Sequence, residues 1–189
     1  CVGPTFDVNA LVNPVPTVLA TPSAETVCED GVTSIVLSNP NGVAGTSYTW
    51  TVSSSANVTG ASAASGAVIA QTLGLTDNTQ GSVTYTITPS SGAGCDGTIT
   101  TVVVTVNPQP DATATDETIC SGDVTNISIS TPNGVSGTTY TWVVQSNAGG
   151  VTGAVPGSGN VIAQHLFNPL STPQTVTYRI TPRSGAGCV

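Results

Sequence analysis

The chain contains no lysine and no methionine, and its only histidine is His165. Its two cations, Arg179 and Arg183, stand against 10 carboxylates, which leaves a formal net charge of -8. Phosphate binding draws its affinity from clustered lysine and arginine, so this balance argues against nucleic acid as a partner. Without lysine the chain cannot form Lys–Asn isopeptide crosslinks, and any covalent staple must be cysteine.

Long apolar runs are missing as well. No stretch of about eighteen apolar residues occurs, and Cys1 is followed by strand-like sequence instead of a basic segment and an apolar one. We therefore expect no membrane insertion in this segment, and we find no signal peptide in it. A targeting signal upstream is compatible with this, since we expect the chain to begin inside a module.

Groups for catalysis are scarce. A hydrolase needs a nucleophile, a base and an orienting acid, and His165 could serve only one of two sequence copies, because Thr72 takes its place in the other. No G-x-S-x-G motif occurs, and the glycine clusters at 60–66 and 149–159 precede strand-like runs instead of helices. We expect neither enzyme activity nor a cofactor.

What the sequence does contain is a repeat, in which Cys120 stands 92 residues after Cys28. The stretch C-E-D-G-V-T-S-I-V-L-S-N-P-N-G-V-A-G-T-S-Y-T-W from Cys28 corresponds to C-S-G-D-V-T-N-I-S-I-S-T-P-N-G-V-S-G-T-T-Y-T-W from Cys120. The match continues through V-T-G, V-I-A-Q and V-T-Y and ends in S-G-A-G-C at Cys95 and Cys188. A fixed period of this size indicates tandem copies of one module.

The repeat also defines the expected module boundaries. Cys1 and Asn13 stand 94 residues before Cys95 and Asn107, each asparagine being followed by proline. The chain begins with Cys-Val, the two letters on which it ends, so we expect copies to join in register into a polymer whose repeat is two modules. The expected parts are the last strand of a preceding module at 1–16, module 1 at 17–109, and module 2 at 110–189 without its own last strand.

Strand-like alternation and β-branching recur in short runs. Turn-forming residues such as Asn39-Pro40-Asn41-Gly42 separate these runs, and no segment has a helical period. About seven short strands per module favour an all-β fold of immunoglobulin-like β-sandwiches. Short proline-rich joints at 13–16 and 107–110 are semi-rigid, so we expect tandem modules in an extended rod. In the first copy the runs lie at 33–38, 46–53, 68–75, 82–89 and 98–106.

Four aromatic residues take equivalent places in the two copies. Trp50 and Trp142 each follow Tyr-Thr, and Tyr85 and Tyr178 each end a V-T-Y motif. Burying one such ring stabilises a module by about 2 to 3 kcal/mol. We interpret all four as core anchors; the alternative is that the tryptophans lie at the surface and stack on sugars.

The order of these motifs resembles the PKD-like repeats. The chain has Pro-x-Pro, then V-C-E-D-G or I-C-S-G, a central Y-T-W, a late V-T-Y-x-I-T-P and a closing G-C. Such repeats occur in giant secreted surface proteins of gliding, type IX-secreting Gram-negative bacteria. The resemblance covers the whole chain and implies an immunoglobulin-like sandwich, export to the cell exterior, and work in an adhesin stalk or filament.

Five isolated cysteines in an acidic, strand-rich chain indicate disulfides formed outside the cytoplasm. Their spacing and the single histidine do not fit zinc, so we expect no metal. In an immunoglobulin-like module the first and last cysteines lie at opposite poles, about one strand of ~33 Å apart, whereas a disulfide needs Cα atoms within about 7 Å. We therefore prefer a bridge between modules, Cys28–Cys188. The alternatives are Cys28–Cys95 with Cys120–Cys188, and Cys1–Cys28 with Cys95–Cys120.

Carboxylates gather near the first cysteine of each copy, at Glu29-Asp30 and at Asp116-Glu117 with Asp123. Calcium takes about six to eight oxygen ligands from converging carboxylates, and these positions only partly repeat between the copies. We interpret them as solvated turn residues, with calcium at module junctions as the alternative.

Two functions from different classes fit these features. The first is a structural shaft of an extracellular filament or giant cell-surface adhesin, whose partners are neighbouring modules of the same or an identical chain. The second is a module that binds glycans or a cell surface through the inter-strand loops at 53–66 and 145–159. Sameness of the copies favours the shaft.

Overall fold

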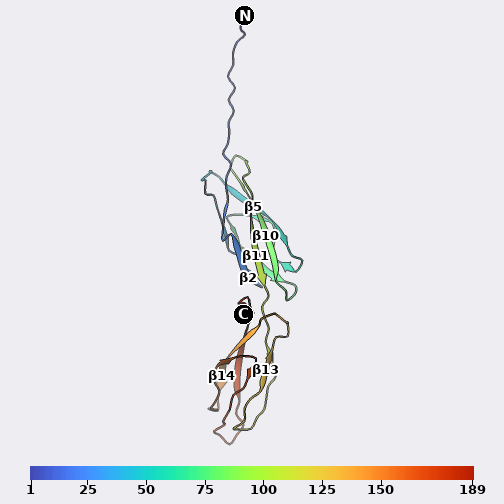
Figure 1. Ribbon diagram of the computed structural model, residues 1–189. Helices are drawn as coiled ribbons and strands as arrows, with labels where there is room; N and C mark the ends of the chain where they lie inside the picture. Colours follow the sequence, from blue (N-terminus) through green and yellow to red (C-terminus); the bar gives the residue numbers. More distant parts are fainter. The chain divides into compact units, whose positions relative to one another are not determined.

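The computed structural model describes all 189 residues, and every regular element in it is a β-strand (Figure 1). The all-β class expected from the sequence is confirmed, and the strands form five sheets. The chain has no helix that is long and apolar enough to cross a membrane. By its internal contacts it divides into two compact units, the first made of Cys1–Gly74 with Ser82–Thr105 and the second of Leu75–Gly81 with Val106–Val189.

The first unit contains eleven strands. The strands are β1 (Leu19–Thr21), β2 (Ala24–Cys28), β3 (Gly31–Val32), β4 (Ile35–Ser38), β5 (Ser47–Ser54), β6 (Val58–Thr59), β7 (Ala64–Ser65), β8 (Val68–Ile69), β9 (Thr72–Leu75), β10 (Gly81–Ser90) and β11 (Thr100–Asn107). The last residue of β9, the first residue of β10 and the last two residues of β11 group with the second unit by their contacts. About seven strands were expected. The number is higher because four of the strands, β3, β6, β7 and β8, are only two residues long.

The main sheet of this unit has the order β2-β11-β10-β5-β7, and two three-stranded sheets have the orders β1-β4-β8 and β3-β9-β6. β10 runs antiparallel to β5, with Ile87 opposite Trp50. Because side chains alternate along a strand, Val83, Tyr85 and Ile87 share one face of β10, and all three are 0% exposed. The core also contains Ile35, Ile69, Leu73, Val102 and Val104.

The run at 68–75, expected as one strand, is two strands in different sheets, β8 and β9. Gln71 lies between them and explains the break. Its backbone N–H donates to Thr33 Oγ1 at 2.9 Å, and its side-chain oxygen accepts a hydrogen bond from the Tyr85 hydroxyl at 2.9 Å. The chain therefore leaves the ladder at Gln71, while Ile69 and Leu73 on either side remain buried.

The second unit repeats this plan with fewer strands. β14 pairs antiparallel with β17, and Ile180 lies opposite Trp142 as Ile87 lies opposite Trp50. Its sheets have the orders β12-β13-β16 and β15-β14-β17, so β17 is an end strand whereas β10 is interior. The strands are β12 (Thr113–Ala114), β13 (Ile127–Ser130), β14 (Thr139–Asn147), β15 (Gly157–Ser158), β16 (Val161–Ile162) and β17 (Val176–Arg183).

The glycine of the repeated V-T-G motif packs closely against the backbone of a neighbouring segment. Gly60 and Gly153 have φ values of +85 and +93, in the region that favours glycine. A Cβ at Gly60 would lie 2.0 Å from the Thr72 carbonyl oxygen, and one at Gly153 would lie 1.9 Å from the His165 carbonyl oxygen. The equivalent residues Thr72 and His165 thus share a backbone role that is independent of their side chains.

Candidate functional site

One asparagine holds the start of the first unit. Asn41 lies in the P-N-G turn, and its Oδ1 accepts a hydrogen bond from Thr17 N at 3.1 Å. Its Nδ2 donates to the Val15 carbonyl at 2.9 Å. The proline-rich segment that leads into the unit is therefore tied to the unit's own turn, an arrangement we call the joint clamp.

The second unit has the same joint clamp. Asn133, in the second P-N-G turn, accepts from Asp111 N at 3.2 Å and donates to the Gln109 carbonyl at 2.9 Å. Gln109 and Asp111 follow Asn107-Pro108, just as Val15 and Thr17 follow Asn13-Pro14. The clamp fixes the direction in which the chain enters each unit.

The first unit also contains a polar network that joins the buried Thr33 and Tyr85 to the half-buried Gln71 and the exposed Ser62. Thr33 Oγ1 donates to the Ile69 carbonyl at 3.0 Å. Gln71 Oε1 also accepts from Ser62 N at 3.0 Å, and Gln71 Nε2 donates to the Ser62 carbonyl at 2.7 Å. The network connects three strand segments and a loop through satisfied polar groups, which is the condition under which buried polar groups add to a unique fold.

The second unit reproduces this network with a different loop residue. Thr125 Oγ1 donates to the Ile162 carbonyl at 2.7 Å, and Gln164 N donates to Thr125 Oγ1 at 2.9 Å. Tyr178 Oη donates to Gln164 Oε1 at 2.7 Å. Gln164 also bonds both backbone groups of Val155. The repeated V-I-A-Q motif is thus the centre of a network that the sequence reasoning did not assign, although its glutamine in an apolar run was a signal.

Burial perturbs the two network tyrosines. Desolvation raises the pKa of Tyr85 to about 12, with a smaller lowering from a hydrogen bond to Thr33 and a smaller raising from Glu25. Desolvation also raises the pKa of Tyr178. Both hydroxyls therefore stay protonated at neutral pH, and each donates a hydrogen bond to the glutamine of its unit.

Three carboxylates near the first cysteines of the two units accept hydrogen bonds from backbone N–H groups. Glu25 accepts from Ser34 N at 3.1 Å through each oxygen, and Glu117 accepts from Asn126 N at 2.8 Å. Asp123 accepts from Cys120 N at 3.2 Å. No group of three or more His, Cys, Asp and Glu side chains is placed to hold a metal ion.

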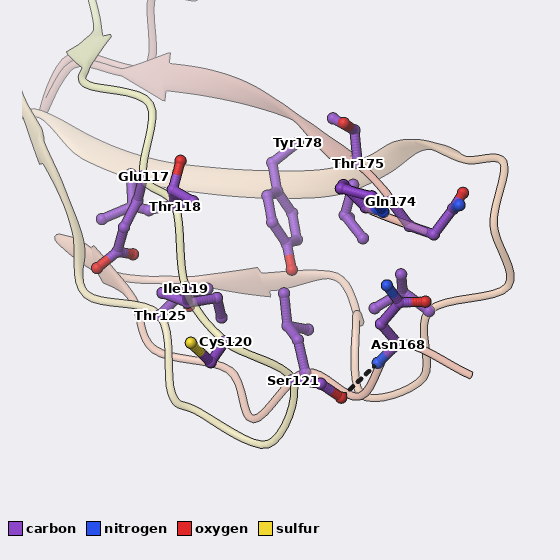
Figure 2. Close-up of a pocket in the computed structure, with 15 residues that line it drawn as sticks. Glu117, Thr118, Ile119, Cys120, Ser121, Thr125, Asn168, Gln174, Thr175 and Tyr178 are labelled. Carbon is purple, nitrogen blue, oxygen red and sulfur yellow. Dashed lines mark hydrogen bonds between the residues drawn. The ribbon is translucent and has the colours of Figure 1, made fainter. Parts of the chain in front are cut away.

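The second unit has an open groove beside β17. Two adjoining cavities of about 330 and 530 Å³ both border Glu117, Ile127, Val176 and Tyr178. One wall is the segment 116–120, and the other is the start of β17. Figure 2 shows the Tyr178 ring pointing into the space between the Glu117–Cys120 segment and the Asn168–Gln174 segment.

Comparison with known families supplies the decisive observation, since the model of the PKD-like domain matches residues 25–110 and again residues 117–189. The chain belongs to the PKD-like domain family. The family expected from the order of motifs is therefore confirmed, with two successive matches for two sequence copies. No curated protein matches the chain.

The cysteines of the PKD-like modules fall into two groups. Cys28, at the end of β2, and Cys188 are disulfide-bonded. Cys1, Cys95 and Cys120 carry free thiols. The alternatives that pair Cys95 or Cys120, within a module or with Cys1 and Cys28, are therefore not what the structure contains. Cys95 and Cys188 occupy matching hairpins, in which their N–H groups donate to Ser91 Oγ and Ser184 Oγ, each at 3.1 Å.

The aromatic positions of the PKD-like modules are mostly internal. Trp50 and Trp142 are 5% and 6% exposed, so neither offers a ring face for a sugar. Tyr85 is fully buried, whereas Tyr178 is partly exposed at the open groove. Tyr48 and Tyr140 of the Y-T-W motifs are buried as well, which sequence reasoning did not single out. The Tyr of Y-T-W lies two residues before the Trp, so strand alternation places both on one face.

Proposed function

We propose that this chain is a length of the structural shaft of an extracellular filament or giant cell-surface adhesin, and that it has no active site. The observation that carries the proposal is the joint clamp, which occurs at Asn41 and at Asn133 with the same pair of backbone partners. A shaft requires each module to receive the chain in the same way, because its stability comes from the module and its contact with the next.

The shaft is an extended rod in this proposal. Proline fixes φ and restricts the residue before it, so the segments at 13–16 and 107–110 are short and semi-rigid. The joint clamp shortens the free part further. It ties Val15 and Thr17 to Asn41 of the first unit, and Gln109 and Asp111 to Asn133 of the second unit. Little chain is then left to bend between modules.

The disulfide is the second element of the shaft. Cys28 and Cys188 are the cysteines engaged in disulfide bonding while the other three are free, which supports the bridge Cys28–Cys188 between consecutive modules. Such a bridge stabilises mainly by restricting the unfolded chain, by about 2 to 4 kcal/mol, and it also limits bending at the joint. Disulfides form and persist mainly in oxidising environments, which supports the extracellular location in this proposal.

Electron microscopy of the native material tests the shaft. We expect a beaded fibre with an axial spacing of about 40 Å, one sandwich length by strand rise. Compact globules would contradict the rod and the shaft together.

Peptide mapping without reduction tests the bridge. We expect one crosslinked peptide that contains Cys28 and Cys188. Cys28→Ser then widens the distribution of bend angles between the two modules in single-particle images, because the joint loses its covalent limit. Cys95→Ser is the matched control, since Cys95 already carries a free thiol. Equal distributions for all three proteins would contradict a stiffening role.

The second function, binding of glycans through the loops at 53–66 and 145–159, stays a prediction. No feature of these loops favours it over the shaft. A glycan array probed with this two-module chain tests it directly. A strong, saturable signal would favour the binding module over the shaft.

A further inference from the structure

Each joint clamp is built on an asparagine that is followed by glycine. The dipeptide Asn-Gly occurs twice in the chain, as Asn41-Gly42 and as Asn133-Gly134, and both times the asparagine is the clamp residue. Every other asparagine is followed by a residue with a side chain. The residues that hold the start of the two units therefore share a dipeptide that is found nowhere else in the sequence.

The turn itself requires this glycine. Gly42 and Gly134 have φ values of +66 and +69, in the left-handed region where a residue with a Cβ is strained. A Cβ added at either glycine would meet nothing within 4 Å, so the surroundings are open. The backbone conformation, and not close packing, therefore demands glycine after each clamp asparagine.

A following glycine also makes asparagine reactive. The backbone nitrogen of the next residue can attack the side-chain amide carbon of asparagine, and a residue without a side chain hinders this attack least. Gly42 N donates to the Asn39 carbonyl at 3.3 Å, and Gly134 N donates to the Thr131 carbonyl at 3.2 Å. Both distances lie at or beyond the long end of the usual range, so the attacking nitrogens are weakly held.

We propose that Asn41 and Asn133 are sites of spontaneous deamidation, and that this modification opens the joint clamp. In the first unit, the Gly42 nitrogen forms a bond to Cγ of Asn41 and gives its proton to the side-chain nitrogen, which leaves as ammonia. Water then opens the resulting cyclic imide to aspartate or isoaspartate. Gly134 and Asn133 react in the same way, and water is the only co-reactant.

The product cannot form both hydrogen bonds of the clamp. Nδ2 of Asn41 donates to the Val15 carbonyl at 2.9 Å, and a carboxylate in its place has no proton to donate. Two acceptor oxygens then face each other. The bond from Thr17 N can persist in aspartate, but it then holds the clamp alone. In isoaspartate the backbone is longer by one carbon, which shifts the carboxylate relative to both partners.

The intact clamp slows the reaction. The nitrogen that donates to the entering chain, Nδ2 of Asn41 or of Asn133, is the group that has to leave. Deamidation therefore requires the side chain to release its partners first. The rate at each site then reports how often that clamp opens.

The two asparagines are held unequally. Asn133 Oδ1 also accepts a hydrogen bond from Thr131 Oγ1 at 2.9 Å. The residue equivalent to Thr131 is Asn39, which donates to the Val43 carbonyl instead. Asn133 is half-buried, whereas Asn41 is exposed. We expect Asn41 to react about three- to tenfold faster than Asn133, the factor that one hydrogen bond contributes.

The added charge has a larger effect in the second unit. Its carboxylate forms beside Asp111, whose N–H binds this side chain, whereas the equivalent Thr17 of the first unit is neutral. Like charges repel, so the second clamp opens further once it has reacted. The chemistry depends on the clamp and the Asn-Gly pair alone and stands whether or not the chain is a shaft. In a shaft, it frees the chain entry of each module as the material ages.

Mass spectrometry of peptic peptides tests the modification, after the 189-residue chain has been incubated in mildly alkaline buffer. We expect the mass gain of an amide replaced by a carboxyl at Asn41, then at Asn133, and at no other asparagine over the same time. In urea both sites react alike, at least about tenfold faster than Asn133 does in the folded chain, because no clamp holds them. No gain at either site, or equal rates in the folded chain and in urea, would overturn the inference.

A valine substitution tests the protection at one clamp. Thr131→Val removes the extra bond to Asn133, so this site should react about three- to tenfold faster than in the natural chain. Thr138→Val is the matched control, because Thr138 lies in the same loop and donates to the Val135 carbonyl instead of to Asn133. Equal acceleration by both substitutions would overturn the role assigned to the clamp.

Amide hydrogen exchange measures the opening itself. Asn41→Asp and Asn133→Asp reproduce the aspartate product, and we expect faster exchange of the Thr17 and Asp111 amides, with the larger change at Asp111. Asn160→Asp adds the same charge at an exposed position outside the clamp and leaves both amides unchanged. Unchanged exchange in the two clamp variants would overturn the inference. Native material without a beaded fibre would contradict the shaft and leave these results as they are.

Discussion

The two units share sequence, joint clamp and polar network, and they differ in whether the main sheet is complete. The first unit contains β11 and has a closed core on both sides of Tyr85. The second unit keeps the same residues around Tyr178 and leaves them partly exposed. The comparison separates two kinds of contribution. The Thr-Gln-Tyr network forms without the last strand, whereas burial of the apolar face depends on it.

Alanine at one pair of equivalent core positions has the largest expected effect. Ile35→Ala leaves a cavity in a closed core and destabilises the first unit by about 3 to 5 kcal/mol. Ile127→Ala, at the open groove, costs about 1 to 2 kcal/mol, because part of that side chain is in water already. Hydrogen exchange followed by mass spectrometry measures each unit separately in one sample. Equal losses would mean that the groove is closed in solution.

High pH acts more strongly on the first unit. The pKa of Tyr85 is about 12 in the folded state against 10.0 for a free tyrosine. The folded state therefore holds its proton while the unfolded state loses one, so stability is complete below pH 10 and falls as pH rises toward 12. Tyr85→Phe makes this loss of stability with pH shallower. Part of the loss remains, because the pKa of Tyr48 is also raised by burial. Denaturant unfolding at several pH values gives the slopes; a slope unchanged by Tyr85→Phe would contradict the assignment.

Removal of the threonine hydroxyl from the polar network is expected to destabilise both units by the same amount. Thr33→Val leaves the backbone N–H of Gln71 without its acceptor, and Thr125→Val does the same to the backbone N–H of Gln164. We expect each to cost about 1 to 2 kcal/mol, because a buried donor loses its partner. Thr→Ser at the same positions is the control and retains the bond. A much smaller cost in the second unit would show that water from the groove reaches Gln164.

Three of the five strands of the main sheet were predictable from alternation, since β5, β10 and β11 lie within one to two residues of the expected runs, whereas β2 and β7 lie outside those runs. The break at Gln71 was not, because a period of two does not reveal that one polar side chain turns inward to meet Tyr85. The joint clamp was missed for a related reason. The P-N-G turn was recognised, but Asn41 bonds backbone atoms 24 and 26 residues away, which no local pattern encodes.

The last prediction concerns a small difference in stability cost between phenylalanine substitutions at the two equivalent tryptophans. Trp50 Nε1 donates to the Ser62 carbonyl at 3.2 Å, whereas Trp142 Nε1 is buried without a partner. Gly157 packs against the Trp142 ring so closely that a Cβ would lie 2.6 Å from Cζ2. Trp50→Phe loses ring contacts and a hydrogen bond, while Trp142→Phe loses ring contacts and also removes an unpaired donor, which offsets part of the cost. We therefore expect Trp50→Phe to be more destabilising by about 1 kcal/mol, measured by hydrogen exchange of each unit. Equal costs would place a water on Trp142 Nε1 and make the two tryptophan sites alike.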